Sequence, residues 1–130
     1  MKLKNSFPYN FFFSKITIIL WFFSILIVFY LSLIPQVETP IDFKYSDKVW
    51  HVLTYLWLSF LPYVGFEYRK KALLGSLLMI VLGVGLEFGQ SFIPEREATI
   101  SDLIANNIGV VTGILFGSTL RRFYHGNFKR

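Results

Sequence analysis

The sequence contains no cysteine and comparatively few charged residues. The absence of cysteine excludes disulfides, thiol catalysis and cysteine-ligated metal sites. Charged residues make up 16% of the 130 residues and hydrophobic residues 54%, whereas an average soluble domain carries roughly 25% charged residues. A soluble chain of this length could not bury so much apolar surface, so a lipid environment is the simpler interpretation. The length predicts a single domain, residues 1–130.

The apolar residues form four long runs, which we interpret as transmembrane helices. The runs cover residues 16–34, 49–64, 72–92 and 100–120, close to the roughly 20 residues that a bilayer core requires. The first run is too long for the apolar region of a signal peptide and no A-x-A-like site follows it, so we expect an uncleaved anchor. Isolated strands cannot satisfy their backbone in lipid. The predicted fold is therefore an all-α, integral membrane four-helix bundle.

The distribution of charge predicts the orientation of this bundle. Basic residues lie in the N-terminal segment, in the loop with Arg69, Lys70 and Lys71, and in the C-terminal tail, whereas the first and third loops are acidic or nearly neutral. The positive-inside rule then places both termini in the cytoplasm, as in a multi-pass protein of the plasma membrane. Because the basic residues follow no periodic face, the net charge of +5 does not indicate a nucleic-acid partner.

This topology gathers the polar residues of three helices at the outer face of the membrane. Glu87 lies inside its span, where a carboxylate is costly unless it is paired or protonated, and such residues are functional candidates by default. We expect Arg96 to be its cation, with Lys48 and protonated His51 as alternatives. The full set comprises Asp47, Lys48, His51, Glu87, Gln90, Arg96, Asp102 and Asn106.

Helical spacing aims these residues into the bundle. On the fourth run, Asp102 and Asn106 continue into Gly109-x-x-x-Gly113-x-x-x-Gly117, a doubled small-residue motif that permits close helix contact. The face that packs against a neighbour should therefore be the face that carries the polar residues.

The remaining small and aromatic residues give two further expectations about packing. On the third run, Gly85 and Gly89 are expected to accept a close neighbour in the same way. Trp21, Trp50 and Trp57 are expected to face lipid or the membrane interface, where tryptophan is enriched.

Each polar residue also has an ordinary structural interpretation. Asp102 follows Thr99 at a helix start, where a carboxylate suits the positive end of the helix dipole. A single histidine such as His51 is more often a hydrogen-bonded packing residue than a catalyst, and Gln90 could simply bond across helices. The functional interpretation therefore depends on the convergence of the whole set rather than on any one member.

The same residues resemble the VanZ-like family of small bacterial membrane proteins. The resemblance covers residues 47 to 117, and the glycine that usually precedes the family's loop arginine is replaced by Glu95. The family is named for a member linked to teicoplanin resistance, so the resemblance implies an association with the cell envelope and makes glycopeptide antibiotic resistance a candidate function. It implies no defined reaction. The matching motifs are Asp47-Lys48-x-x-His51-x-x-x-Tyr55, Glu87-x-x-Gln90-x-Phe92-x-Pro94-x-Arg96 and Asp102-x-x-x-Asn106-x-x-Gly109-x-x-x-Gly113.

Two functions stay open at this point. In the first, the protein acts on or binds a lipid-linked envelope substrate, with His51, Glu87 and Asp102 as candidate catalytic residues. His51 would serve as general base or acid and Glu87 as the complementary acid. In the second, the cluster is a non-catalytic structural or partner-binding network. The candidate substrate-binding residues are Asp47, Lys48, Gln90, Arg96 and Asn106.

The sequence gives little information on cofactors and partners. It contains no metal-binding spacing such as H-E-x-x-H, so no metal is predicted, although a divalent ion held by His51, Glu87 and Asp102 is an open alternative. No cofactor is indicated. The expected partners are membrane lipids or a lipid-linked envelope precursor, with a second copy of the chain as a further candidate.

Overall fold

The computed structural model describes residues 11–35, 41 and 43–127. These residues form four helices and contain no strand, which confirms the all-helical prediction. The acidic residues Glu38 and Asp42 of the first loop and the charged chain ends lie outside the described residues, so the cytoplasmic location of the termini stays a prediction. The helices are α1 (Phe11–Leu33), α2 (Ser46–Gly65), α3 (Arg69–Gln90) and α4 (Ile100–Asn127).

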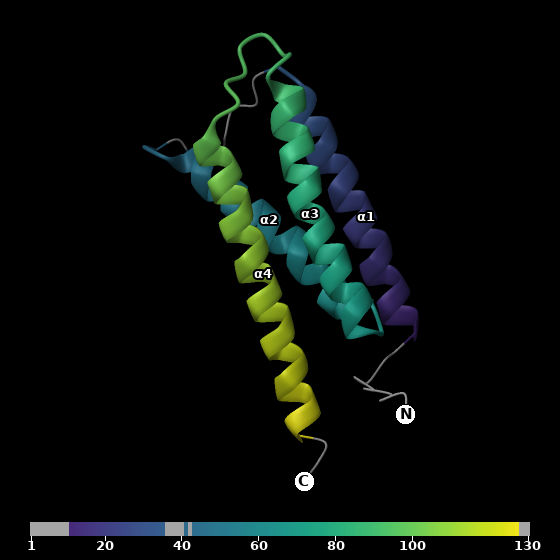
Figure 1. Ribbon diagram of the computed structural model, residues 1–130. Helices are drawn as coiled ribbons and strands as arrows, with labels where there is room; N and C mark the ends of the chain where they lie inside the picture. The colour runs from purple at the N-terminus through teal and green to yellow at the C-terminus, as the bar shows by residue number, and fades with distance from the viewer. Residues whose placement is uncertain (1–10, 36–40, 42, 128–130) are drawn as a thin grey trace.

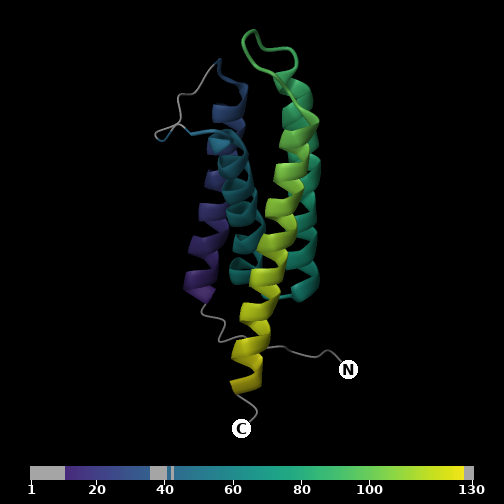
Figure 2. The same ribbon diagram turned by 90° about the vertical axis from the view of Figure 1, so that its left-hand side faces the viewer.

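The helices pass back and forth between two ends of the molecule. In Figure 1, α1 and α3 run side by side in one direction, and α2 and α4 return in the other. We call the end that carries the connection 91–99 between α3 and α4 the loop end. We call the end where α1 begins and α4 finishes the terminal end, and α4 projects there beyond the other three helices (Figure 2).

The second helix forms the centre of this arrangement. α2 packs against α1, α3 and α4, and its Tyr55, Leu58 and Leu61 form a buried core with Trp21 of α1 and Val110 of α4. The other three helices, α1, α3 and α4, are long and apolar enough to cross a membrane. α2 does not meet that criterion because it carries more polar residues. Its crossing stays a prediction, which its position among three apolar helices supports.

The glycine face of α4 makes the closest contact in the bundle. A Cβ atom added at Gly113 would lie 2.5 Å from the carbonyl oxygen of Leu56, and one at Gly109 would collide with the carbonyl oxygen of Val52. Both contacts are with the backbone of α2, so only glycine permits this approach. The predicted packing face of α4 is confirmed.

The expected glycine contacts of α3 are only partly present. Gly89 approaches the side chain of Leu33, but nothing lies within 4 Å of a Cβ added at Gly85. Gly83 instead faces Tyr55 and Asn106 across the bundle. The expectation for Gly85 is therefore wrong, because the rotation of α3 about its axis turns that residue outward.

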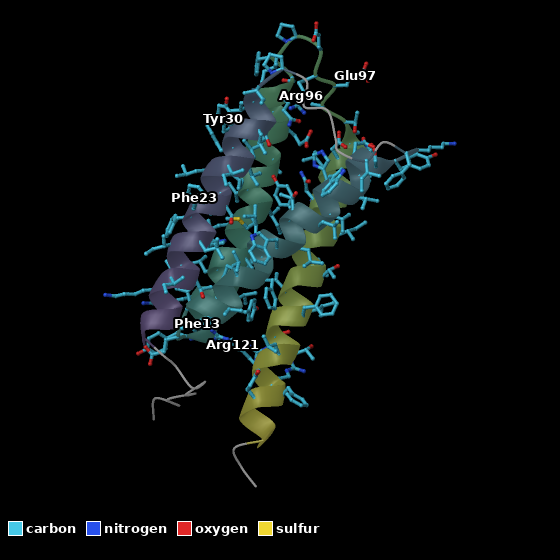
Figure 3. The ribbon with its side chains drawn as sticks, turned by 180° about the vertical axis from the view of Figure 1, so that it is seen from behind. Phe13, Phe23, Tyr30, Arg96, Glu97 and Arg121 are labelled. Atoms are coloured by element: carbon cyan, nitrogen blue, oxygen red, sulfur yellow. The ribbon has the colours of Figure 1, made fainter. Side chains whose placement is uncertain are left out.

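The outer surface of α1 is apolar and unburied. Phe23 is 59% exposed and Leu26 66% exposed, and Figure 3 shows Phe13, Phe23 and Tyr30 projecting away from the bundle. Trp21 differs from the expectation that it faces lipid. It is 5% exposed, and its indole N–H donates to the carbonyl oxygen of Leu58 at 2.8 Å, because a buried indole requires an acceptor.

Candidate functional site

An ammonium group joins α2 to α4 at the loop end. Lys48 of α2 donates to Asp47 at 2.6 Å and to Asp102 of α4 through a very short contact. Asp102 is 6% exposed, and its second carboxylate oxygen accepts from the hydroxyl of Thr99 at 2.7 Å. Thr99 also accepts from the backbone N–H of Asp102 at 3.3 Å. Thr99 therefore caps α4, and Asp102 supplies the carboxylate of the first turn.

The charges around Lys48 affect its protonation and that of Asp47. The hydrogen bond from Lys48 holds the pKa of the Asp47 carboxyl below its usual value. Partial burial disfavours the charged form of Lys48, but hydrogen bonds to Asp102 and Asp47 outweigh that effect and raise the pKa of the ammonium. Lys48 and Asp47 are thus a charged pair at neutral pH.

One helical turn further along, His51 bonds to α4. Its Nδ1 lies 2.8 Å from the side-chain oxygen of Asn106. Because that carbonyl oxygen can only accept, Nδ1 carries the hydrogen and the lone pair of the neutral ring is on Nε2. Nε2 lies 3.8 Å from Asp102, and Nδ1 lies 3.9 Å from Glu87. The imidazole therefore stands between two carboxylates from different helices.

Glu87 and Gln90 are buried on the facing side of α3. Glu87 is 5% and Gln90 6% exposed. The Oε2 atom of Glu87 is buried without a hydrogen-bond partner, and the same holds for Nδ2 of Asn106. Such atoms are uncommon in folded proteins, and each requires an explanation.

Arg96 has a different partner from the one that the sequence suggested. Its guanidinium donates from Nε and Nη2 to the carbonyl oxygen of Ile34 at 3.1 and 3.0 Å and from Nη2 to that of Leu31 at 2.8 Å. These carbonyls lie at the C-terminal end of α1, where backbone carbonyl groups have no hydrogen-bond partner within the helix. Arg96 lies near the upper end of α1 in Figure 3, whereas Glu97 lies on the outer side of the loop. The basic group that pairs with Glu87 among the described residues is instead His51, at 3.9 Å.

A cavity of about 240 Å³ opens between α1, α2 and α3 at the loop end. One part of its wall is polar, with His51 and Glu87. The rest is partly apolar, with Val28 and Leu31 of α1. Lys48, Asp102 and Asn106 lie outside the wall, on the α4 side of His51. The full lining consists of Val28, Leu31, Ser32, Asp47, Trp50, His51, Thr54, Tyr55, Leu86, Glu87, Gln90 and Arg96.

The structure thus brings the sequence-predicted residues to one end of the molecule in two groups. The first lines the cavity, and the second ties α2 to α4 behind it. The residues that sequence reasoning missed are those of α1, above all Val28, Leu31 and Ser32. An apolar lipid-facing helix carries no pattern that marks which of its side chains border a cavity.

Taken together, these features define a helical membrane protein with a polar site at one end of its bundle. The chain belongs to the VanZ/LLP1 family, whose sequence profile matches residues 5–121. The match extends beyond residues 47–117, on which the resemblance rested, and includes α1. The chain is also 31% identical over 99 residues to the uncharacterized protein C11E3.10 of Schizosaccharomyces pombe. That region is 74% of this chain and 56% of the yeast protein, so the chain spans little more than half of this relative. No solved structure matches the chain.

Proposed function

We propose that this protein binds the anionic head group of a lipid-linked envelope precursor in the loop-end cavity, in the plasma membrane, and acts on it there. The observation that carries the proposal is the mixed wall of the cavity. His51 and Glu87 face a space that Val28 and Leu31 border on the other side. A head group with an apolar chain needs such a junction of polar and apolar surface.

The size of the cavity limits what can enter. Sites for drug-sized molecules usually measure about 300–1,000 Å³, and this cavity measures about 240 Å³. It accommodates the part of a head group nearest the lipid chain, such as a phosphate or a single sugar ring. The larger remainder of an envelope precursor would extend beyond the loop end.

The side chains around the cavity are suited to proton transfer. The neutral tautomer of His51 has Nε2 available to accept a proton, and its Nδ1–H is held by Asn106 at 2.8 Å. Glu87 supplies a buried carboxyl on the facing helix, the environment in which a carboxyl group can remain protonated and act as an acid. Arg96 adds a positive charge at the wall for an anionic group.

A protein with this activity would change the supply of precursors that glycopeptide antibiotics recognise. This connects the proposed function with the teicoplanin resistance for which the VanZ family is named. We expect cells that carry the wild-type protein to tolerate a higher teicoplanin concentration than cells that carry Glu87→Gln at equal protein abundance.

The direct test incubates purified wild-type protein in nanodiscs with a panel of envelope lipids and follows the lipids by mass spectrometry. With the wild type, we expect one lipid class either to be consumed or to remain bound to the protein. With Glu87→Gln, we expect neither. Glu97→Gln is the matched control, because Glu97 is an exposed carboxylate of the loop. If the lipid profile and the bound lipids are the same for wild type and Glu87→Gln, the proposal fails.

The alternative is a non-catalytic network, and a specific observation favours it. Lys48 links α2 to α4, and Arg96 fastens the loop to α1. With the contact between His51 and Asn106, five of the eight predicted residues take part in links between helices or between the loop and α1. If Glu87→Gln destroys the abundance of the protein rather than its effect on lipids, the network is the better account of the cluster.

A further inference from the structure

Three side chains from three helices converge at the polar wall of the cavity. His51 comes from α2, Glu87 from α3 and Asp102 from α4, and one potential ligand atom from each lies within 4.8 Å of the other two. Bonds from zinc to nitrogen and oxygen ligands are about 2.0–2.2 Å long, so the ligand atoms around a tetrahedral ion are separated by roughly 3.3–3.6 Å. Side-chain movements of less than an ångström would bring the three ligand atoms to bonding distance from a single ion.

The orientation of the imidazole matches that of a metal ligand. Histidines that bind metals almost always donate their second ring N–H to a carbonyl or carboxylate oxygen. Here Nδ1 donates to the side-chain oxygen of Asn106 at 2.8 Å. The lone pair on Nε2 is thus directed to the side of Asp102, at 3.8 Å.

An unsatisfied carboxylate oxygen is an independent sign of a missing ligand. Glu87 is 5% exposed, and its Oε2 atom has no hydrogen-bond partner. Lys48 bonds to Asp102 and Asp47 but not to Glu87. Within the described residues, no hydrogen bond compensates the burial of Oε2, and a bound cation would do so.

We propose that His51, Glu87 and Asp102 bind one divalent transition-metal ion. A ligand set of one imidazole and two carboxylates suits Zn²⁺ better than Ca²⁺ or Mg²⁺, which take oxygen ligands. The cavity gives the ion an access route, because His51 and Glu87 form part of its wall. An ion held by Nε2 of His51 and by Glu87 would replace the proton-transfer roles given to these two side chains above, and it would bind the anionic head group itself. Only that role rests on the proposed function. The binding of the ion does not.

The test measures Zn²⁺ binding to chelator-treated, purified protein in detergent without added lipid. Isothermal titration gives the affinity, and elemental analysis gives the number of ions for each chain. We expect one ion for each wild-type chain and at least a hundredfold weaker binding for Glu87→Gln and Asp102→Asn. Glu97→Gln, which changes an exposed carboxylate, should bind as the wild type does. Ca²⁺ should bind at least tenfold more weakly than Zn²⁺.

A second pair of variants tests the positioning role of Asn106. Asn106→Ala should weaken Zn²⁺ binding about 10–100-fold, as is usual when the partner of a ligating histidine is lost. Asn107→Ala is its matched control, because the amide of Asn107 donates to the carbonyl oxygen of Leu103 at 2.7 Å and does not touch His51. Each variant is compared only if its helical circular dichroism and its elution volume match those of the wild type.

Two results would overturn the inference. One is a wild-type protein that binds no Zn²⁺ at 100 µM, and the other is unchanged affinity in both Glu87→Gln and Asp102→Asn. The outcome is separable from that of the lipid experiment. Zn²⁺ binding without any effect on lipids would support the metal site and refute the proposed function. An effect on lipids without Zn²⁺ binding would support the proposed function and refute the metal site.

Discussion

The two ends of the bundle each bury a charged side chain, but they treat it differently. At the terminal end, Arg121 is 8% exposed and donates to the carbonyl oxygens of Tyr63, at 2.7 Å, and Phe66. Its guanidinium also lies 5.6 Å from the centre of the Tyr63 ring. At the loop end, Glu87 is 5% exposed, has one oxygen without a partner and lies 3.9 Å from His51.

The difference separates a structural charge from one that is available for a ligand. Arg121 meets carbonyls at the C-terminal end of α2, which lack partners within the helix and form the negative end of its dipole. Contacts within the protein therefore account for the buried position of Arg121. Burial of Glu87 is costly, and among the described residues no contact satisfies its Oε2 atom. The two ends should therefore respond oppositely to loss of charge.

The largest effect is expected from removal of the Arg121 charge. Arg121→Met should destabilise the protein by about 2–4 kcal/mol, because it removes charge-assisted hydrogen bonds and leaves buried carbonyls without donors. Thermal unfolding of the purified protein, followed by circular dichroism, measures the loss. Arg122→Met is the matched control, since Arg122 is exposed and its replacement should change stability by less than about 0.5 kcal/mol. Equal unfolding curves for the two variants would contradict a structural role for Arg121.

A smaller effect, without loss of stability, is expected at the other end. Glu87→Gln should leave the free energy of unfolding unchanged or raise it by up to about 1 kcal/mol, because it removes an uncompensated buried charge. Residues at functional sites often lower the stability of a protein, so replacing one commonly makes the protein more stable. The same unfolding measurement applies, with Glu97→Gln as the control. A loss of more than about 2 kcal/mol would show that Glu87 holds the bundle together and would remove the contrast between the two ends.

The smallest effect concerns the loop that positions Arg96. Glu95 has a φ of 67°, a conformation that costs a residue with a side chain roughly 1–2 kcal/mol and glycine very little. Glycine also loses about 0.5–1 kcal/mol more entropy on folding. Glu95→Gly should therefore stabilise the protein by about 0.5 kcal/mol. Glu97 has no positive φ, so Glu97→Gly should not stabilise the protein. A lower unfolding temperature for Glu95→Gly than for Glu97→Gly would show that the loop conformation does not strain Glu95.

Much of the architecture could be predicted from the sequence because long apolar runs determine helices in lipid. The close face of α4 was also predictable, since Gly109 and Gly113 leave no side chain between α4 and α2. The same regularity placed Asp102 and Asn106 on the buried side of α4, where the structure has them. At the position of the family's loop glycine, Glu95 has a φ of 67°, a conformation that glycine adopts more readily.

The remaining features depend on how each helix is rotated and on backbone atoms. The apolar α1 and α3 have no sequence pattern strong enough to fix their rotation, so Trp21 is buried and Gly85 faces open space. Arg96 was expected to meet a carboxylate, but it binds the carbonyl oxygens of Leu31 and Ile34. Every residue has a carbonyl group, so no side chain in the sequence could have identified these acceptors.

The manner in which Arg96 holds α1 has a consequence for how this protein can evolve and be engineered. The guanidinium contacts main-chain oxygens, and outward side chains of α1, such as Phe23 and Leu26, are largely exposed. Apolar residues on the outer face of α1 can therefore be exchanged for other apolar residues during evolution. This face is the place to attach a probe or to match the chain to a bilayer of different thickness without disturbing the polar cluster at the loop end.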